Sequence, residues 1–167
     1  MAIINFFDTS ALLGGYKLAQ EDRNIISPIV FEELETIKTS STKDEATKYK
    51  ARSLIRYLMS HRDLWETCCL NQTQIDKILY KTNYLPDSND SRLICEAEII
   101  AEQNKRNIYF ITSDASQYLL ANNFKKLYST YWKDTSHKES LWKGYQEVEL
   151  DDDRLSCLYS NPEINLL

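Results

Sequence analysis

The chain has 167 residues, which suits one domain, and its 43% hydrophobic content is enough to build a buried core. Its formal net charge of -5 gives no general attraction for nucleic acid, which usually binds a basic patch or a basic domain. Four cysteines without CxxC spacing and only two histidines argue against a zinc site. The absence of a signal peptide or a long apolar run predicts a cytoplasmic protein with reduced thiols and no membrane contact.

Strand and helix patterns alternate along the chain. Apolar runs predict strands at 3–7, 25–28, 64–70 and 108–111, with an edge strand at 124–128. Apolar residues at helical spacing predict helices at 30–38, 44–62, 72–81 and 88–104, with a last one from about 115 and a short polar helix-like stretch after residue 7. This alternation predicts an α/β fold: a three-layer α/β/α sandwich with a mostly parallel central sheet.

Two acidic residues stand at the carboxyl ends of predicted strands. Asp8 directly follows the run 3–7, and Asp114 comes shortly after the run 108–111. In open parallel sheets, ligands bind in the crevice outside the carboxyl ends of the strands. The sequence therefore predicts that both carboxylates reach the same edge of the sheet.

Two further acids, Glu33 and Asp90, lie in the first turns of predicted helices. Any one of the four acids, taken alone, is more simply a helix cap or a solvated side chain, because acids favour the positive end of a helix. Their joint placement indicates one site. Carboxylates clustered without histidine or cysteine suit a hard cation, Mg²⁺ or Mn²⁺, and a water bound to such an ion can hydrolyse a phosphodiester.

The segments around these acids resemble the PIN-domain nucleases, metal-dependent enzymes that cut single-stranded RNA. They read Phe-Asp-Thr-Ser-Ala-Leu-Leu at 7–13, Ile-Val-Phe-Glu-Glu-Leu-Glu at 29–35, Asp-Ser-Arg-Leu-Ile at 90–94 and Ile-Thr-Ser-Asp at 111–114. Each motif is short, but their order and spacing along the chain fit the family.

Within the family, the best match is the PIN module at the N-terminus of PhoH-type proteins. Residues 144–150 and 158–159 look like the linker that leads to a P-loop ATPase in those proteins, although no GxxxxGK[ST] motif occurs here. We therefore expect a PIN-like domain over 1–130 and a C-terminal extension over 131–167.

The resemblance implies an endoribonuclease that uses Mg²⁺ or Mn²⁺, with metal-binding and catalytic roles for Asp8, Glu33, Asp90 and Asp114. It also implies hydroxyl groups that orient these carboxylates, at Thr9, Ser10 and Thr112. Glu32 competes with Glu33, and we choose Glu33 because the acid of the family immediately precedes a core leucine. Asp87 competes with Asp90, and in the preceding loop it is either a turn former or a support for the metal ligands.

A basic stretch inside the acidic chain is the candidate surface for RNA. Residues 36–62 carry seven basic residues against two acidic ones, and three of the basic residues recur at helical i, i+4 spacing. A solvated helix face explains the spacing equally well. The predicted RNA contacts are Lys48, Lys50, Arg52, Arg56 and Arg92. Tyrosines could stack on unpaired bases at positions 49, 57 and 84, although ordinary packing is the simpler explanation for most tyrosines.

Two other classes of function stay open. An aspartyl phosphatase also begins with a strand that ends in aspartate, but Ser10 stands where its second aspartate is usual. A non-catalytic module would keep the fold and bind RNA or a partner protein, such as an ATPase domain. Homo-oligomers are common among the relatives, and no pattern in the sequence decides this point.

Overall fold

The computed structural model describes residues 2–82 and 85–133, and its strands form one parallel sheet. The strands are β1 (Ile4–Phe7), β2 (Arg23–Ile26), β3 (Trp65–Thr67), β4 (Ile108–Thr112) and β5 (Leu127–Tyr131). They lie in the order β3-β2-β1-β4-β5, and every neighbouring pair is parallel. The predicted linker at 144–159 and the tyrosine at position 84 lie outside the described residues.

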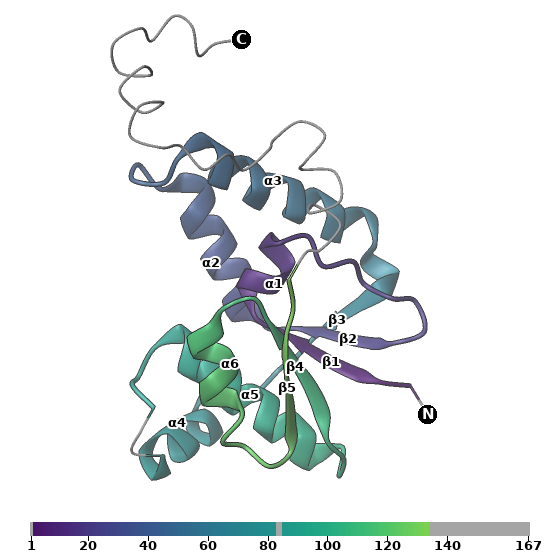
Figure 1. Ribbon diagram of the computed structural model, residues 1–167, viewed down its shortest axis with the longest axis vertical. Helices are drawn as coiled ribbons and strands as arrows, with labels where there is room; N and C mark the ends of the chain where they lie inside the picture. Colours follow the sequence, from purple (N-terminus) through teal and green to yellow (C-terminus); the bar gives the residue numbers. More distant parts are fainter. Residues whose placement is uncertain (1, 83–84, 134–167) are drawn as a thin grey trace, which may run out of the picture. The chain divides into compact units, whose positions relative to one another are not determined.

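Helices cover both faces of this sheet. The helices α1 (Thr9–Leu13), α2 (Pro28–Thr39) and α3 (Glu45–Ser60) lie on one side, and α4 (Gln72–Lys81), α5 (Asn89–Gln103) and α6 (Ala115–Ala121) lie on the other (Figure 1). A short 3-10 helix, η1 (Arg62–Leu64), precedes β3. The three layers confirm the predicted α/β/α sandwich. In the described ranges no helix combines the length and the apolar character that crossing a membrane requires.

The two central strands, β1 and β4, are the best buried part of the sheet. All four residues of β1 are buried, and Phe6 and Phe7 have no exposed surface. Phe6 stacks on Phe110 of β4 with 6.0 Å between the ring centroids. Strands covered on both faces need such apolar runs. The carboxyl ends of β1 and β4 are therefore held in place by the core.

The direction of the chain through the sheet reverses between β1 and β4. From β1 the chain continues outward to β2 and β3, and it then crosses back to β4 and continues to β5 on the other side. In open α/β sheets the ligand crevice lies at such a reversal, outside the carboxyl ends of the strands. Asp8 and Asp114 follow the two strands that meet there.

Three predicted strands differ clearly from the observed ones. The strand expected at 25–28 lies at 23–26, because Ser27 caps α2, which begins at Pro28. The strand expected at 124–128 begins three residues later, because Leu127 pairs in register with Ile108 and residues before it form a turn in which Leu127 N–H donates to the carbonyl of Phe124 at 3.1 Å. The strand expected at 64–70 is shortened to β3, whose three residues pair with β2 alone. Edge strands have one partner, so local pattern determines their bounds only loosely.

Candidate active site

Asp8 is the buried centre of the site. It is the N-cap residue of α1 and is only 3% exposed. Its Oδ2 accepts hydrogen bonds from Ser10 Oγ and Thr112 Oγ1, both at 2.7 Å. Its backbone N–H donates to the carbonyl of Ile111 at 2.9 Å, which continues the pairing of β1 with β4 by one residue. The carboxylate is thus held by one hydroxyl from α1 and one from β4.

The two hydroxyl groups also bind the loop that follows β4. Each hydroxyl has one proton, and both protons point at Asp8, so the oxygens are left as acceptors. Ser10 Oγ accepts from the N–H of Ser113 at 2.9 Å, and Thr112 Oγ1 accepts from the N–H of Asp114 at 3.0 Å. The two hydroxyl oxygens lie 3.2 Å apart with no proton left to share. Ser10 and Thr112 therefore couple the position of Asp8 to the backbone that carries Asp114.

Glu33 in α2 is the most strongly perturbed carboxylate of the site. Burial, and after it the negative charges of Asp8 and Asp90, raise the pKa of Glu33 to about 7, against a smaller lowering by the hydroxyl of Thr9. That contact with Thr9 falls short of a hydrogen bond, since Glu33 Oε1 and Thr9 Oγ1 are both buried without a hydrogen-bond partner among the described residues. The rival Glu32 is exposed.

Asp90 and Asp114 lie at the more exposed side of the site. Asp90 is in the first turn of α5, and its pKa is raised because nearby protein atoms remove part of its water and because Asp8 and Asp114 add negative charge. Asp114 is the N-cap of α6, and its Oδ1 accepts from the N–H of Ser116 at 2.9 Å and of Gln117 at 3.4 Å. The side chain of Gln117 donates to the carbonyl of Asp90, which ties the starts of the two helices together.

The donor set fits a hard divalent cation. The pKa values of Asp8, Glu33 and Asp90 are raised by burial and by the charge of neighbouring acids. All donors are oxygens, and the orphaned Glu33 Oε1 is a buried acceptor in need of a positive partner. Within 2–82 and 85–133, however, no three Asp, Glu, His or Cys side chains form a ready metal-binding group. Mg²⁺ keeps several waters and usually takes one or two carboxylates directly, so such an open set is compatible with it.

Arg92 and Asp87 pair with each other beside this cluster. Arg92 Nε lies 3.0 Å from Asp87 Oδ1, and Arg92 Nη1 lies 3.2 Å from Asp76 Oδ1 in α4. The side chain of Arg92 is only 20% exposed. Two carboxylates therefore compensate the charge of Arg92, which joins α4 to the start of α5. The predicted RNA contact at Arg92 and the predicted metal support at Asp87 remain predictions.

Lys48, Arg52 and Arg56, the basic residues of α3 at i, i+4 spacing, form the predicted basic ridge. Part of its charge is neutralised by an acid of the same helix. Glu45 Oε1 lies 3.6 Å from Lys48 Nζ, and Glu45 Oε2 lies 3.8 Å from Arg52 Nη2. The guanidinium carbon of Arg56 lies 6.0 Å from the ring centroid of Tyr49. Exposed pairs of this kind are weak and break at little cost, but they lower the positive charge that the ridge presents.

Gln117 is a residue of the site that the sequence reading missed. It is 2% exposed and bridges from α6 to the backbone of Asp90. A signal was present, because Asp114 and Gln117 have the spacing of a capping box. Here the glutamine side chain binds the neighbouring helix instead of returning to its own N-cap.

These features together define a three-layer α/β domain with an acidic site at the reversal point of a parallel sheet. The family model described as "PIN domain" matches residues 6–125, and the chain belongs to the PIN-domain family. The matched range contains all four acids, and the family part of the resemblance is confirmed. The narrower relationship to PhoH-type proteins stays a prediction.

One similar solved structure supports the same fold. It is described as a domain of a functionally unknown protein from Methanocaldococcus jannaschii DSM 2661. The similarity has a TM-score of 0.50 and 21% sequence identity, and it covers 90% of this chain and 99% of that chain. No curated protein matches the chain significantly.

Proposed function

We propose that this PIN-domain protein is a metal-dependent endoribonuclease that hydrolyses phosphodiester bonds of single-stranded RNA. The observation that carries the proposal is the unpartnered, buried Oε1 of Glu33 among Asp8, Asp90 and other carboxylates. Such an oxygen is stabilised by a cation or by a proton, and a metal-dependent nuclease binds a cation at its carboxylates. Membership of the PIN-domain family supports the assignment through the nuclease-type fold.

The residues that would hold Mg²⁺ or Mn²⁺ are Asp8, Glu33, Asp90 and Asp114. When bound, the ion supplies a water that is more acidic than bulk water and neutralises charge on the phosphate. Ser10 and Thr112 keep Asp8 oriented by their two hydrogen bonds. Glu33, with a pKa of about 7, holds and releases a proton at neutral pH when no cation is present. Thr9 Oγ1 is a buried hydroxyl available to the same group.

The basic residues of α3 are the proposed phosphate contacts. The first residue of α1 directly follows Asp8, and the segment after α1 contacts α3, where Leu18 N–H donates to Tyr57 Oη at 3.1 Å. Lys48, Lys50, Arg52 and Arg56 therefore belong to an element next to the acidic site, and they can attract a phosphate backbone that the acids alone would repel.

A non-catalytic PIN-fold module that binds RNA or a protein is the second candidate. It is favoured by the lack of a closed group of three metal ligands in the described part of the chain. A companion ATPase domain is a further proposal, which rests on the resemblance of residues 144–159 alone. Self-association is a proposal at the same level.

Cleavage of a labelled, unstructured RNA tests the main proposal. We expect cleavage with Mg²⁺ or Mn²⁺, loss of cleavage in EDTA and in Asp8→Asn, and retention in Asp63→Asn, a matched control at the exposed, amino-terminal side of β3. DNA of the same sequence should be cut more slowly. Cleavage that survives both EDTA and Asp8→Asn comes from a contaminant and contradicts the assignment. RNA binding without any cleavage by the parent protein favours the binding module.

A further inference from the structure

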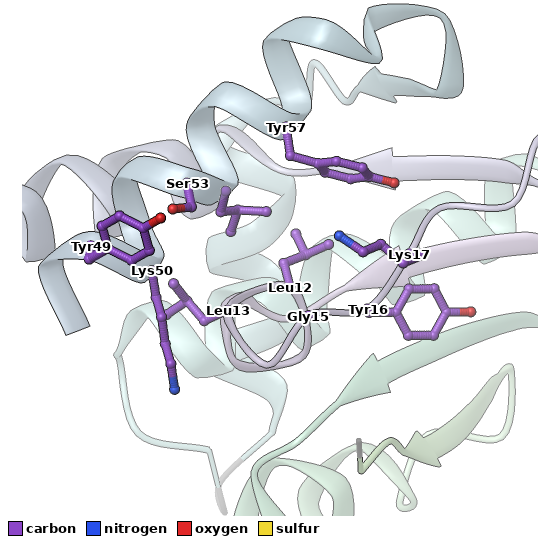
Figure 2. Close-up of a pocket in the computed structure, with 10 residues that line it drawn as sticks. Leu12, Leu13, Gly15, Tyr16, Lys17, Tyr49, Lys50, Ser53 and Tyr57 are labelled. Carbon is purple, nitrogen blue, oxygen red and sulfur yellow. The ribbon is translucent and has the colours of Figure 1, made fainter. Parts of the chain in front are cut away.

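A pocket of about 170 Å³ lies between α3 and the chain at the end of α1 (Figure 2). Its inner lining is apolar and includes Leu12 and Leu54. Tyr49 lies at one end beside Lys50, and Lys17 lies at the other end. None of the residues that line the pocket is acidic. The pocket thus combines an apolar floor, an aromatic ring and two cations.

Neither lysine of this pocket forms an ion pair with a described residue, although the charge of Lys50 acts on the nearby carboxylate of Asp44. Among the described residues, no carboxylate lies within ion-pair distance of Lys17 or Lys50, whereas Lys48 and Arg52 share Glu45. Lys17 Nζ instead lies 4.5 Å from the ring centroid of Tyr57. Lys17 and Lys50 therefore add positive charge at the pocket that is not shared with a carboxylate in the way that Lys48 and Arg52 share Glu45.

Tyr49 offers an aromatic surface that the protein does not cover. It is 61% exposed, and the guanidinium carbon of Arg56 lies 6.0 Å from its ring centroid, at the outer limit of a cation–π contact. Tyr57, by contrast, is covered by Lys17 and uses its hydroxyl to accept from Leu18 N–H. Exposed aromatic rings beside lysines are how single-stranded nucleic acids are bound without readout of sequence.

The pocket is a short step from the acidic site. Asp8 caps the start of α1, and Leu12 and Leu13 at its end line the pocket. A helix of this length spans roughly 7 Å, so one strand of RNA can reach both places. The volume is well below the 300–1,000 Å³ or so of a drug-sized ligand site, which suits a single ring system.

We propose that this pocket binds one unpaired base of the RNA, stacked on Tyr49, while Lys17 and Lys50 bind the flanking phosphates. The inference rests on the proposed function, because it takes RNA as the ligand. An apolar side chain of a protein partner would fill the floor of the pocket, but it would leave Lys17 and Lys50 without an anionic partner. The charge therefore favours RNA.

A comparison of two oligomers separates stacking from charge. Binding of the full chain, carrying Asp8→Asn to prevent cleavage, is measured by fluorescence anisotropy with labelled oligouridylate and with an abasic oligoribonucleotide of the same length. We expect the base-containing oligomer to bind roughly 5- to 150-fold more tightly, as one stacked base would provide. Tyr49→Ala and Tyr49→Leu should abolish this preference, and Tyr49→Phe should retain it.

The lysine variants should behave in a different way. Lys17→Ala and Lys50→Ala should weaken binding of both oligomers equally, and each should lower the salt slope by about 0.7, the value for one single-strand phosphate. Tyr80→Ala and Lys125→Ala are the matched controls, since Tyr80 is exposed on α4 across the sheet and Lys125 precedes the amino end of β5. Thermal melting of each variant shows that it is folded.

The outcomes keep the two proposals apart. Equal binding of the two oligomers, or a base preference that survives both Tyr49→Ala and Tyr49→Leu, overturns the pocket even if the parent protein cleaves RNA. A preference that depends on Tyr49 supports the pocket even if no cleavage is seen, and in that case only the proposed catalysis fails. No binding of either oligomer at low salt overturns the pocket as an RNA site and assigns it to another class of ligand.

Discussion

Thr112 donates a hydrogen bond of 2.7 Å to the carboxylate of Asp8, a residue 104 positions earlier in the chain. The bond is buried and joins the ends of the two central strands. Because Thr112 Oγ1 also accepts from the N–H of Asp114, one hydroxyl holds two of the four acids in relation to each other.

Replacing Thr112 by valine tests this relationship. Thr112→Val keeps the shape and removes both hydrogen bonds, so cleavage should fall roughly 10- to 100-fold and the free energy of unfolding should fall by about 1–3 kcal/mol, the usual effect of losing a buried bond to a charged group. Denaturant unfolding and initial cleavage rates measure the two effects. Thr130→Val on the neighbouring strand is the control, since that hydroxyl donates to the carbonyl of Tyr128 and to no acid of the described residues. Similar losses in both variants would refute a specific role for Thr112.

Glu33 should make the metal-free protein less stable as the pH rises. Its pKa is raised from 4.5 to about 7 on folding. At low pH the group is protonated in both states and has no effect. Between about 4.5 and 7 the unfolded chain releases its proton more readily, so stability falls and stays lower above pH 7. The loss is smaller than the roughly 3.5 kcal/mol to which this shift corresponds at about 1.4 kcal/mol per pKa unit, because solvent screens a carboxylate that is only half buried.

Glu33→Gln isolates this contribution. In EDTA, the variant should melt at the same temperature as the parent near pH 4 and at a higher temperature near pH 8. Glu32→Gln, at the exposed neighbouring position, should follow the parent at both pH values. A Glu33→Gln variant that is less stable than the parent at pH 8 would mean that the carboxylate has a compensating partner. Such a result would remove the main observation behind the metal site.

A divalent cation should stabilise the folded protein through the same acids. At a concentration of 100 times its dissociation constant, one bound Mn²⁺ should add about 2.7 kcal/mol to the free energy of unfolding. Thermal melting should therefore shift upward in the parent and not in the double variant Asp8→Asn, Asp114→Asn. An equal shift in both proteins would place the ion elsewhere and favour the non-catalytic module.

Glu45 should lower the affinity of the protein for RNA. Glu45→Gln releases Lys48 and Arg52 from their shared partner, so affinity for RNA and its salt slope should both rise, with a small loss of helix stability because a first-turn acid is removed. The double variant Arg52→Ala, Arg56→Ala should have the opposite effect on the slope. Glu21→Gln, in the loop before β2, is a control with the same change of charge. Unchanged binding in both α3 variants would remove the ridge from the RNA surface.

Much of the fold was predictable because strong apolar periodicity determines which elements exist. The helix α4 was predicted with its observed bounds, and the bounds of α5 differ by one residue at each end, since Ser88 caps it as turn chemistry suggests. The edge strand β5 was misplaced, because its start depends on the register with Ile108 and not on its own sequence. The stretch after β1 was expected to be polar, but Ala11 and Leu12 are buried.

The candidate site was only partly predictable. Asp8 and Asp114 follow from the rule for strand ends, since both stand next to central strands. The ion pair between Arg92 and Asp76 could not be predicted from the sequence, because it depends on how α4 packs on α5. The pocket beside Tyr49 is also a product of packing, and Lys17, which lies in an irregular segment, gave no pattern of its own.

The sheet order also determines when the site can exist. β1 is made first, but its partner β4 follows about a hundred residues later, and closing so long a loop is entropically slow. Until β4 pairs with β1, Asp8 lacks two of its partners, the hydroxyl of Thr112 and the carbonyl of Ile111. Assembly of the acidic centre therefore depends on a contact across about a hundred residues, and a chain that is still incomplete before residue 112 lacks that centre.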